Sequence, residues 1–126
     1  MSFRFSAMLH IPGDVRHAID FYAQAFGATT GWSTPPAGDM VAQLFAHGAE
    51  FWVHPAGQDI GNPSPAQLGG TPVRLMLIVD DPDAVFDQAV AAGAVVRSPV
   101  QDHDYGWRDG SITDPFGHRW EIGRPL

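Results

Sequence analysis

The order of hydrophobic and polar residues predicts that strands and helices alternate in the first half of the chain. Segments 3–11, 40–46 and 49–54 have the pattern of strands, and a further strand is expected up to about Trp32. Between them, apolar residues recur at helical spacing. Asp14 is a suitable N-cap for that helix and Gly27 is placed to end it. The first half is therefore predicted to be a strand, a helix and three strands.

The second half repeats this order of elements. An apolar strand is expected at 72–79, a helix from Pro82 to Gly93 behind the N-cap Asp81, and strands at 94–100, 106–113 and 118–123. A stretch rich in Pro, Gly, Asn and Ser separates the halves. The pattern predicts one α+β domain of two βαβββ modules, with module one at about 1–55, a linker at about 56–70 and module two at about 71–126.

The end of the chain contains the clearest local signal. Asp114-Pro115-Phe116-Gly117 has the residue types of a tight turn, and the residues on either side have the pattern of strands. After the turn, Trp120 shares a face with Ile122, while Glu121 lies on the opposite face. The segment predicts a hairpin that buries an apolar face and presents the Glu121 carboxylate on the other side.

Composition narrows the function mainly by exclusion. A net charge of −7 argues against binding to nucleic acid or to an anionic membrane surface. There is no cysteine, which excludes disulfides and thiolate chemistry, and all 7 basic residues are arginine, which excludes Schiff-base chemistry. The chain has neither a long apolar run nor a signal-like N-terminus, so we expect a cytoplasmic protein.

Four blocks of the sequence are distinctive, namely Ala18-Ile19-Asp20-Phe21-Tyr22, Leu68-Gly69-Gly70-Thr71-Pro72, Tyr105-Gly106-Trp107-Arg108 and Asp114-Pro115-Phe116-Gly117-His118-Arg119-Trp120. Together they resemble the vicinal-oxygen-chelate superfamily of glyoxalases, bleomycin resistance proteins and dioxygenases, and most of all its PhnB-like proteins. The resemblance implies sheets that curl into an open, barrel-like cleft, a homodimer and a small-molecule ligand. Metal-dependent members hold a divalent ion through His and Glu side chains on the first and last strands of each module.

The ligand positions that the resemblance implies are mostly filled by other residue types. Glu121 is present, but the other positions fall on Arg74, on Trp52 and on either Ser6 or Ala7. A guanidinium and an indole do not bind a cation through a lone pair. We therefore expect no metal cofactor.

The leading hypothesis from the sequence is a metal-free binder of a small, partly aromatic molecule, of the sequestration or resistance type. Alternation places Arg74 and Met76 on the face of their strand that is opposite Leu75, where Arg74 and Glu121 would orient polar groups of a ligand. Trp52 and Trp107 would stack on it. The opposing interpretation is a structural salt bridge, with tryptophans that only cover the sheet.

Two alternatives remain open at this point, and the sequence does not decide whether the chain is an enzyme. His10 and His54 could form a shifted metal site with Glu121, which predicts a metal-dependent lyase, isomerase or dioxygenase. The other alternative is a non-catalytic dimeric scaffold whose cleft is closed by its own side chains, with Trp52 packed against Arg74.

Overall fold

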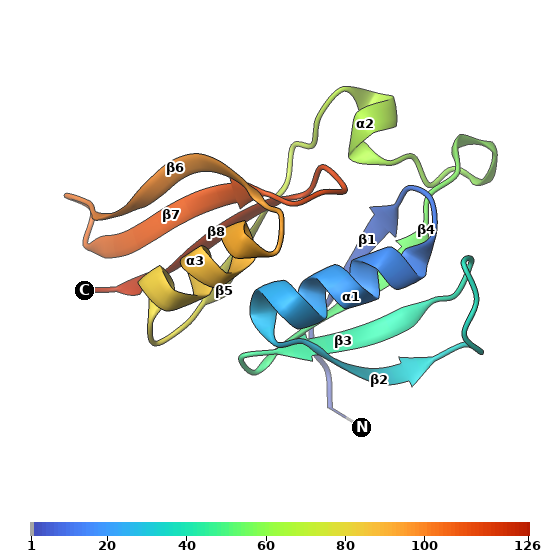
Figure 1. Cartoon of the computed structure of the whole chain (residues 1–126), viewed down its shortest axis with the longest axis horizontal. Coiled ribbons are helices and arrows are strands. Elements are labelled where there is room, and N and C mark those ends of the chain that lie inside the picture. Colours follow the sequence, from blue (N-terminus) through green and yellow to red (C-terminus); the bar gives the residue numbers. More distant parts are fainter. Residues whose placement is uncertain (1) are drawn as a thin grey trace.

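A computed structural model describes residues 2–126, and it shows the predicted α+β architecture (Figure 1). Two four-stranded sheets follow each other along the chain, in the strand orders β1-β4-β3-β2 and β5-β8-β7-β6. The elements are β1 (Ala7–Ile11), α1 (Val15–Phe26), β2 (Thr29–Ser33), β3 (Ala42–Ala46), β4 (Ala49–Pro55), a 3₁₀ turn (Gln58–Ile60), α2 (Pro65–Leu68), β5 (Arg74–Ile78), α3 (Pro82–Ala91), β6 (Val95–Asp102), β7 (Trp107–Thr113) and β8 (Arg119–Pro125).

The two long helices begin where the sequence predicts. The Asp14 carboxylate accepts a hydrogen bond from the backbone N–H of Arg16, and Gly27 ends α1 in the left-handed region at φ 67°. In α3 the Asp81 carboxylate accepts from the N–H of Ala84, and proline fills the first turn. Both helices bury their apolar faces against a sheet, which explains why these sequences become helices in this fold.

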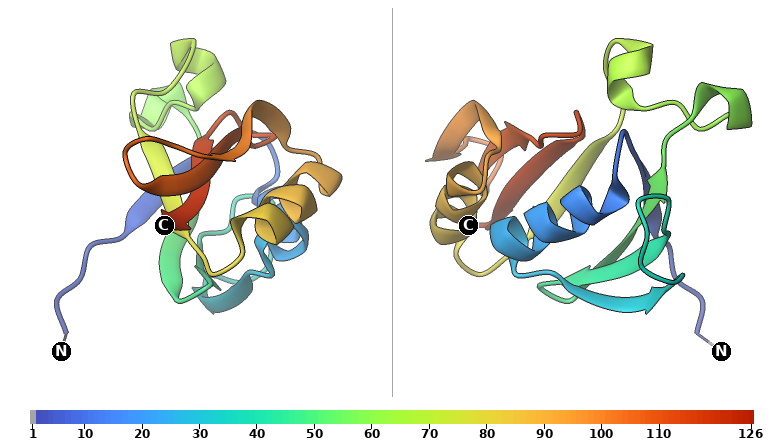
Figure 2. Two further views of the ribbon diagram at one scale, coloured as in Figure 1. Left: turned by 90° about the vertical axis from the view of Figure 1, so that its left-hand side faces the viewer. Right: turned by 45° about the vertical axis from the view of Figure 1, so that its right-hand side comes forward.

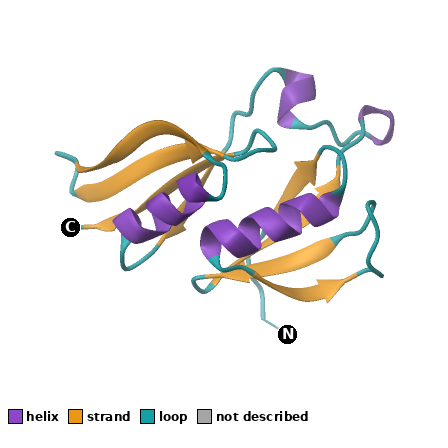
Figure 3. Ribbon diagram, viewed as in Figure 1, coloured by secondary structure: helices purple, strands orange, loops and turns teal. Residues whose placement is uncertain are grey.

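Each module has the same topology. The first strand of each sheet runs parallel to the last one, β1 beside β4 and β5 beside β8, while the remaining pairs are antiparallel. One helix covers one face of each sheet, and within the described part of the chain no helix lies over the other face (Figure 3). We call these the uncovered faces of the first and second sheets. The arrangement confirms the predicted two-module fold.

The two modules pack together through their helix-covered sides (Figure 2). Trp120 of β8 lies 4.9 Å from Phe26 and 5.2 Å from Phe51 between ring centroids, and 5.8 Å from the ring of Tyr22. These aromatic side chains are all buried, and they come from both modules. The core therefore lies between the modules as well as within each of them.

Asp114 ties this aromatic cluster to the β7–β8 turn. One carboxylate oxygen accepts hydrogen bonds from the Tyr22 hydroxyl at 2.5 Å and from the Trp120 indole at 2.9 Å. The other accepts from the backbone N–H groups of Phe116 and His118. The turn predicted from the sequence is confirmed, and its aspartate has a second role as a buried link between the modules.

Two segments differ from the sequence-based expectation. The first strand begins at Ala7, not at residue 3, and Phe3 and Phe5 are almost fully exposed beside the sheet. The linker is also more ordered than a loop, because Ser64 and Gln67 form a capping box at the start of α2. Within residues 2–126 we find no helix with the length and hydropathy that a membrane crossing requires.

Candidate functional site

The uncovered face of the second sheet holds most of the residues that the sequence analysis selected. In the sheet register, Met76 is the partner of Glu121, and Ser111 lies beside Glu121 on β7. Arg74 lies one row away on the same face. Leu77, on the opposite face of β5, is buried. The register therefore places Arg74, Met76 and Glu121 in one patch.

Arg74 and Glu121 form an ion pair at the centre of this patch. Nη1 of Arg74 donates to Oε1 of Glu121 at 2.5 Å. The glutamate side chain is largely covered, with 16% of its area exposed, whereas the arginine side chain is 61% exposed. The carboxylate therefore orients a guanidinium that keeps donors free for another partner.

A second polar cluster lies two positions along the sheet. Asp109 is buried, and its carboxylate accepts from the Tyr105 hydroxyl at 2.9 Å and lies 3.0 Å from Nε2 of His103. The rings of His103 and Tyr105 stack with centroids 4.8 Å apart. Partial desolvation and the hydrogen bond to Asp109 raise the pKa of Tyr105 above its ordinary value. This phenol therefore stays neutral at physiological pH and exposes its ring beside the ion pair.

Trp107 lies farther from Arg74 than the sequence suggested. Trp107 pairs with Pro125, at the C-terminal end of β8. Arg74 pairs with Arg119, at the N-terminal end of the same strand. The two selected residues therefore lie on one sheet but are not neighbours.

The uncovered face of the first sheet is aromatic. Trp52 packs against Trp32 with ring centroids 5.9 Å apart and an interplanar angle of 50°. Met8 is the register partner of Trp52 on β1, and Phe45 is exposed on β3. Trp32 is 57% exposed, so this surface offers ring faces to a flat molecule.

His10 and His54 lie next to the aromatic surface. They are register partners, and their ring centroids are 6.3 Å apart. Nδ1 of His10 donates to the carbonyl of Pro63 at 3.0 Å, and Nδ1 of His54 donates to the carbonyl of Pro55 at 2.9 Å. These bonds fix both rings, with Nε2 left as an acceptor in the neutral form.

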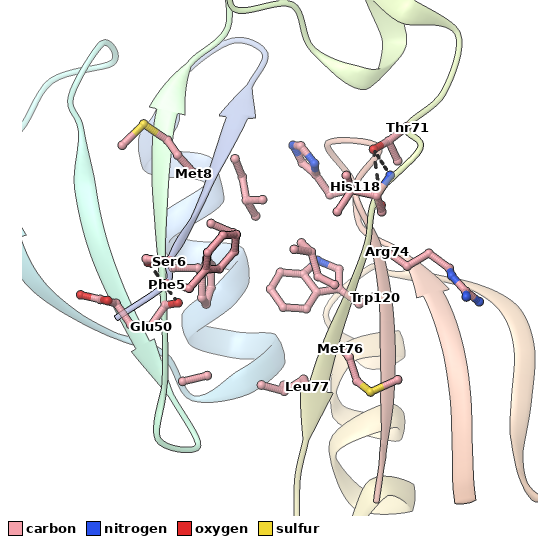
Figure 4. A pocket seen from close by; sticks show the side chains of 16 residues that line it. Phe5, Ser6, Met8, Glu50, Thr71, Arg74, Met76, Leu77, His118 and Trp120 are labelled. Atoms are coloured by element: carbon pink, nitrogen blue, oxygen red, sulfur yellow. Dashed lines mark hydrogen bonds between the residues drawn. The ribbon is translucent and has the colours of Figure 1, made fainter. Parts of the chain in front are cut away.

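The two uncovered faces point in opposite directions within one chain. Figure 4 shows Met8 and Arg74 turned away from each other across the gap between β1 and β5. This follows from the packing of the modules through their helix-covered sides. A cavity of about 700 Å³ lies in that gap, and it is lined by both edge strands together with Phe5, Phe51 and Trp120. The two uncovered faces thus lie on opposite sides of the molecule.

A comparison against protein families agrees with this fold. The model of the Glyoxalase/Bleomycin resistance protein/Dioxygenase superfamily matches residues 5–122. The chain belongs to this superfamily. The match covers both modules of this glyoxalase-superfamily protein, including β8 with Glu121.

Comparison with individual proteins gives three further findings. An uncharacterized protein of Mycobacterium bovis is 41% identical over 118 residues, which are 90% of this chain and 78% of that protein. The crystal structure of TioX from Micromonospora sp. ML1 is 27% identical, with a TM-score of 0.73 and coverage of 99% and 97% of the two chains. The fosfomycin resistance protein FosX of Listeria monocytogenes, complexed with Mn(II) and sulfate, is 14% identical with a TM-score of 0.73 over 100% of this chain and 92% of its own, which shows the shared fold alone.

The superfamily includes metal-dependent members, and the residues of this chain do not fit a metal at the corresponding positions. The carboxylate of Glu121 is engaged by Arg74, and Trp52 occupies another of the positions. Within residues 2–126, no group of three or more His, Cys, Asp or Glu side chains is arranged to hold an ion. A cationic side chain beside the one remaining acid opposes a divalent cation by direct repulsion.

Sequence reasoning missed three features of these surfaces. It did not find the Trp32–Trp52 pair, because β2 carries a register irregularity that periodicity does not reveal. It did not find the cluster around Asp109, because His103 and Tyr105 come from the turn before β7. The spacing Ser64–Gln67 with Pro65 between them was available as a signal for α2, and the prediction overlooked it.

Proposed function

We propose that this glyoxalase-superfamily protein binds a small, partly aromatic molecule without a metal, as a sequestration or resistance protein does. The observation that carries the proposal is the Arg74–Glu121 ion pair at the position where metal-dependent members would have ligands. A guanidinium there attracts a polar or anionic group of a ligand instead of a cation. We further propose that the protein is PhnB-like, because the Tyr105–Arg108 and Asp114–Trp120 blocks resemble that branch of the superfamily.

The aromatic part of the ligand would stack on the first sheet. Trp32 and Trp52 offer large, rigid faces, and Met8 adds a flexible apolar contact beside them. Stacking of this kind accepts many flat molecules, because it needs a π surface and few specific hydrogen bonds. Arg74, with Met76 and Glu121 around it, supplies the polar end of the site.

A complete cleft requires both kinds of surface, and one chain turns them in opposite directions (Figure 4). The proposed cleft is therefore built by two copies of the chain, with the uncovered first sheet of one copy facing the uncovered second sheet of the other. Two such clefts form in a symmetric dimer, because each copy contributes one surface to each cleft.

The proposal is tested by tryptophan fluorescence on untagged protein that has been dialysed against a chelator. Planar aromatic compounds, with and without a carboxylate, are titrated into the wild type and the variants Trp52→Phe, Arg74→Gln and Arg124→Gln. We expect saturable quenching that Trp52→Phe and Arg74→Gln weaken by about tenfold or more. Arg124 is exposed on β8 and forms no ion pair among residues 2–126, so its variant is the matched control.

Two results would sink the proposal. One is the absence of saturable quenching across the panel, and the other is an equal loss in the Arg124→Gln control. The variant Trp107→Phe shows how far the cleft extends along the second sheet, since unchanged binding confines it to the Arg74 end.

A second candidate function has one observation in its favour. The Nδ1 bonds of His10 and His54 leave two Nε2 acceptors near each other, in the orientation that backbone carbonyls give to metal-binding histidines. A metal-dependent lyase, isomerase or dioxygenase would need these residues from one copy together with Glu121 from another copy. It predicts that Glu121→Ala loses a bound metal and an activity together.

The dimeric scaffold is the third candidate, and a contact between Trp52 and Arg74 would favour it. Such a contact would close the cleft with the protein's own side chains. Within one chain Trp52 packs against Trp32 and Arg74 is bonded to Glu121 on the other sheet, so this contact would have to form between two copies.

A further inference from the structure

Three of the seven arginines in this acidic chain gather at one end of the second sheet. Arg74 of β5 is the register partner of Arg119 on β8, and Arg119 is the partner of Thr113 on β7. Nη1 of Arg97 on β6 then donates to Oγ1 of Thr113 at 3.4 Å. These residues form a row across all four strands on the uncovered face. We call Arg97, Thr113 and Arg119 the arginine cradle.

The two guanidinium groups of the cradle are not neutralised within the described chain. Arg4, Arg16, Arg74 and Arg108 each form an ion pair, whereas Arg97 and Arg119 form none among residues 2–126. Nε of Arg119 is moreover buried without any hydrogen-bond partner in that part of the chain. A buried donor of a charged group without an acceptor is costly. The cradle therefore lacks an acceptor that fits it.

The cradle borders a defined cavity. It has a volume of about 430 Å³, and its walls come from the cradle, the linker at 69–71, the start of α2 and the β7–β8 turn. The turn lies against α2, since a Cβ added at Gly117 would come within 2.8 Å of Pro65 (Figure 1). The linker and α2 thus form a wall over the end of the sheet.

One carboxylate also lines this cavity, and it is already fully engaged. Asp114 accepts from Tyr22 and Trp120 with one oxygen and from two backbone N–H groups with the other. It therefore does not offer a free oxygen to either guanidinium. Thr113 accepts from Arg97, so its own hydroxyl hydrogen is available to donate. Neither guanidinium of the cradle therefore has a carboxylate partner among the described residues that line the cavity.

We propose that the arginine cradle binds an oxyanion, namely a carboxylate, phosphate or sulfate group. Two guanidinium groups flanking a hydroxyl supply planar pairs of N–H donors together with one O–H donor, which is the arrangement that such groups accept in charge-assisted hydrogen bonds. The buried Nε of Arg119 gains an acceptor that it lacks among residues 2–126. In a chain of net charge −7, this is a local positive site for a group that the rest of the surface repels.

This site goes beyond the proposed function, because it binds an anion whether or not an aromatic molecule stacks on the first sheet. Its position beside Arg74 would allow one ligand to reach both. The test therefore uses inorganic phosphate, sulfate and acetate alone, so that failure of the cradle and failure of the aromatic cleft are seen separately.

The experiment is a titration of each anion at low ionic strength, followed by calorimetry and by the NMR signals of the arginine Nε–H groups. We expect saturable binding that shifts the Arg119 Nε–H signal. We also expect Arg97→Gln and Arg119→Gln each to weaken binding by about tenfold. Arg97 is exposed, so we expect Arg97→Gln to fold normally, and a loss of binding in this variant is not a loss of folding. The relative affinities of acetate, phosphate and sulfate identify which oxyanion the site prefers.

The control is Arg124→Gln, which removes an arginine that lies outside the cradle and forms no ion pair among residues 2–126. Unchanged anion binding in this variant supports the cradle. The proposal is overturned if none of the three anions binds saturably. It is also overturned if Arg124→Gln lowers affinity as much as Arg97→Gln does, because the attraction would then be nonspecific.

Discussion

At the scale of single residues, Asp114 is a buried carboxylate that links the two modules. It is 3% exposed and accepts four hydrogen bonds, two of them from aromatic side chains in the contact between the modules. Such a carboxylate is tolerated in the interior because every oxygen is satisfied. The turn sequence alone explains only the two backbone bonds.

Replacement Asp114→Asn tests this role. The asparagine amide has the same shape but no charge. Its NH₂ group replaces an oxygen that accepts two hydrogen bonds, so it would face two hydrogen-bond donors. We expect the free energy of unfolding to fall by about 3 kcal/mol, measured by urea denaturation. The control is Asp80→Asn, an exposed residue just before α3, which should change stability little.

Tyr22 gives a prediction for the dependence of stability on pH. Burial first, and then the nearby Asp114 carboxylate, raise the pKa of this phenol well above its usual value of 10.0. The folded chain therefore keeps the proton at a pH where the unfolded chain loses it. This contribution to stability is complete below pH 10 and declines as the pH rises further. Tyr22→Phe should show a weaker alkaline decline, and an identical slope above pH 10 would contradict the assignment.

Sequence patterns predicted which face of a strand a residue occupies, and this was enough to place Arg74, Met76 and Glu121 away from the core. They could not predict lateral neighbours. Arg97, Thr113 and Arg119 lie on three different strands, and their row depends on the register between those strands, including an irregularity between β6 and β7. That register results from packing in three dimensions.

At the scale of elements, caps and turns were predictable because their signals are local. The helix starts at Asp14 and Asp81 and the turn at Asp114 follow from side chains that bond their own neighbouring backbone. The start of β1 was not predictable, because residues 3–6 alternate like a strand yet pair with no strand in the described chain. An alternating sequence does not show whether another strand is available to pair with it.

Gly123 tests the packing of β7 on β8. A Cβ at this position would lie 2.5 Å from Cβ of Asp109 and 2.6 Å from the carbonyl oxygen of Arg108, so the strands would have to move apart. Gly123→Ala should destabilise the protein by about 1–3 kcal/mol in thermal or urea unfolding. Gly38→Ala is the control, since its nearest atom is an ordinary contact at 3.4 Å. Equal stability of the two variants would contradict the close approach.

At the scale of the whole molecule, the decisive feature is the direction of the two uncovered faces. The modules pack through α1, α3 and the aromatic cluster around Trp120, so each sheet turns its other face outward. The sequence predicted both modules but not the directions of their uncovered faces. The helix-covered surfaces are apolar however the modules pack, so the pattern does not distinguish one packing from another. The shared cleft is therefore an inference from the structure.

A mixed dimer tests whether the cleft is shared. Chains with Trp52→Ala and chains with Arg74→Ala are expressed together with different tags, and the mixed dimer is purified. One of its two clefts combines an intact Trp52 surface with an intact Arg74 surface from the other chain. We expect this dimer to bind an aromatic compound that quenches the wild type, while each variant alone binds it weakly. Failure of the mixed dimer to recover binding would show that each chain builds its own cleft.

The central claim is that the site works without a metal, and elemental analysis of the purified, untagged protein tests it most directly. The protein is measured as isolated and again after dialysis against a chelator. With Arg74 bonded to Glu121, we expect a content of divalent metal far below one equivalent per chain in both samples. A content of about one equivalent per chain that survives dialysis and disappears in Glu121→Ala would contradict the account.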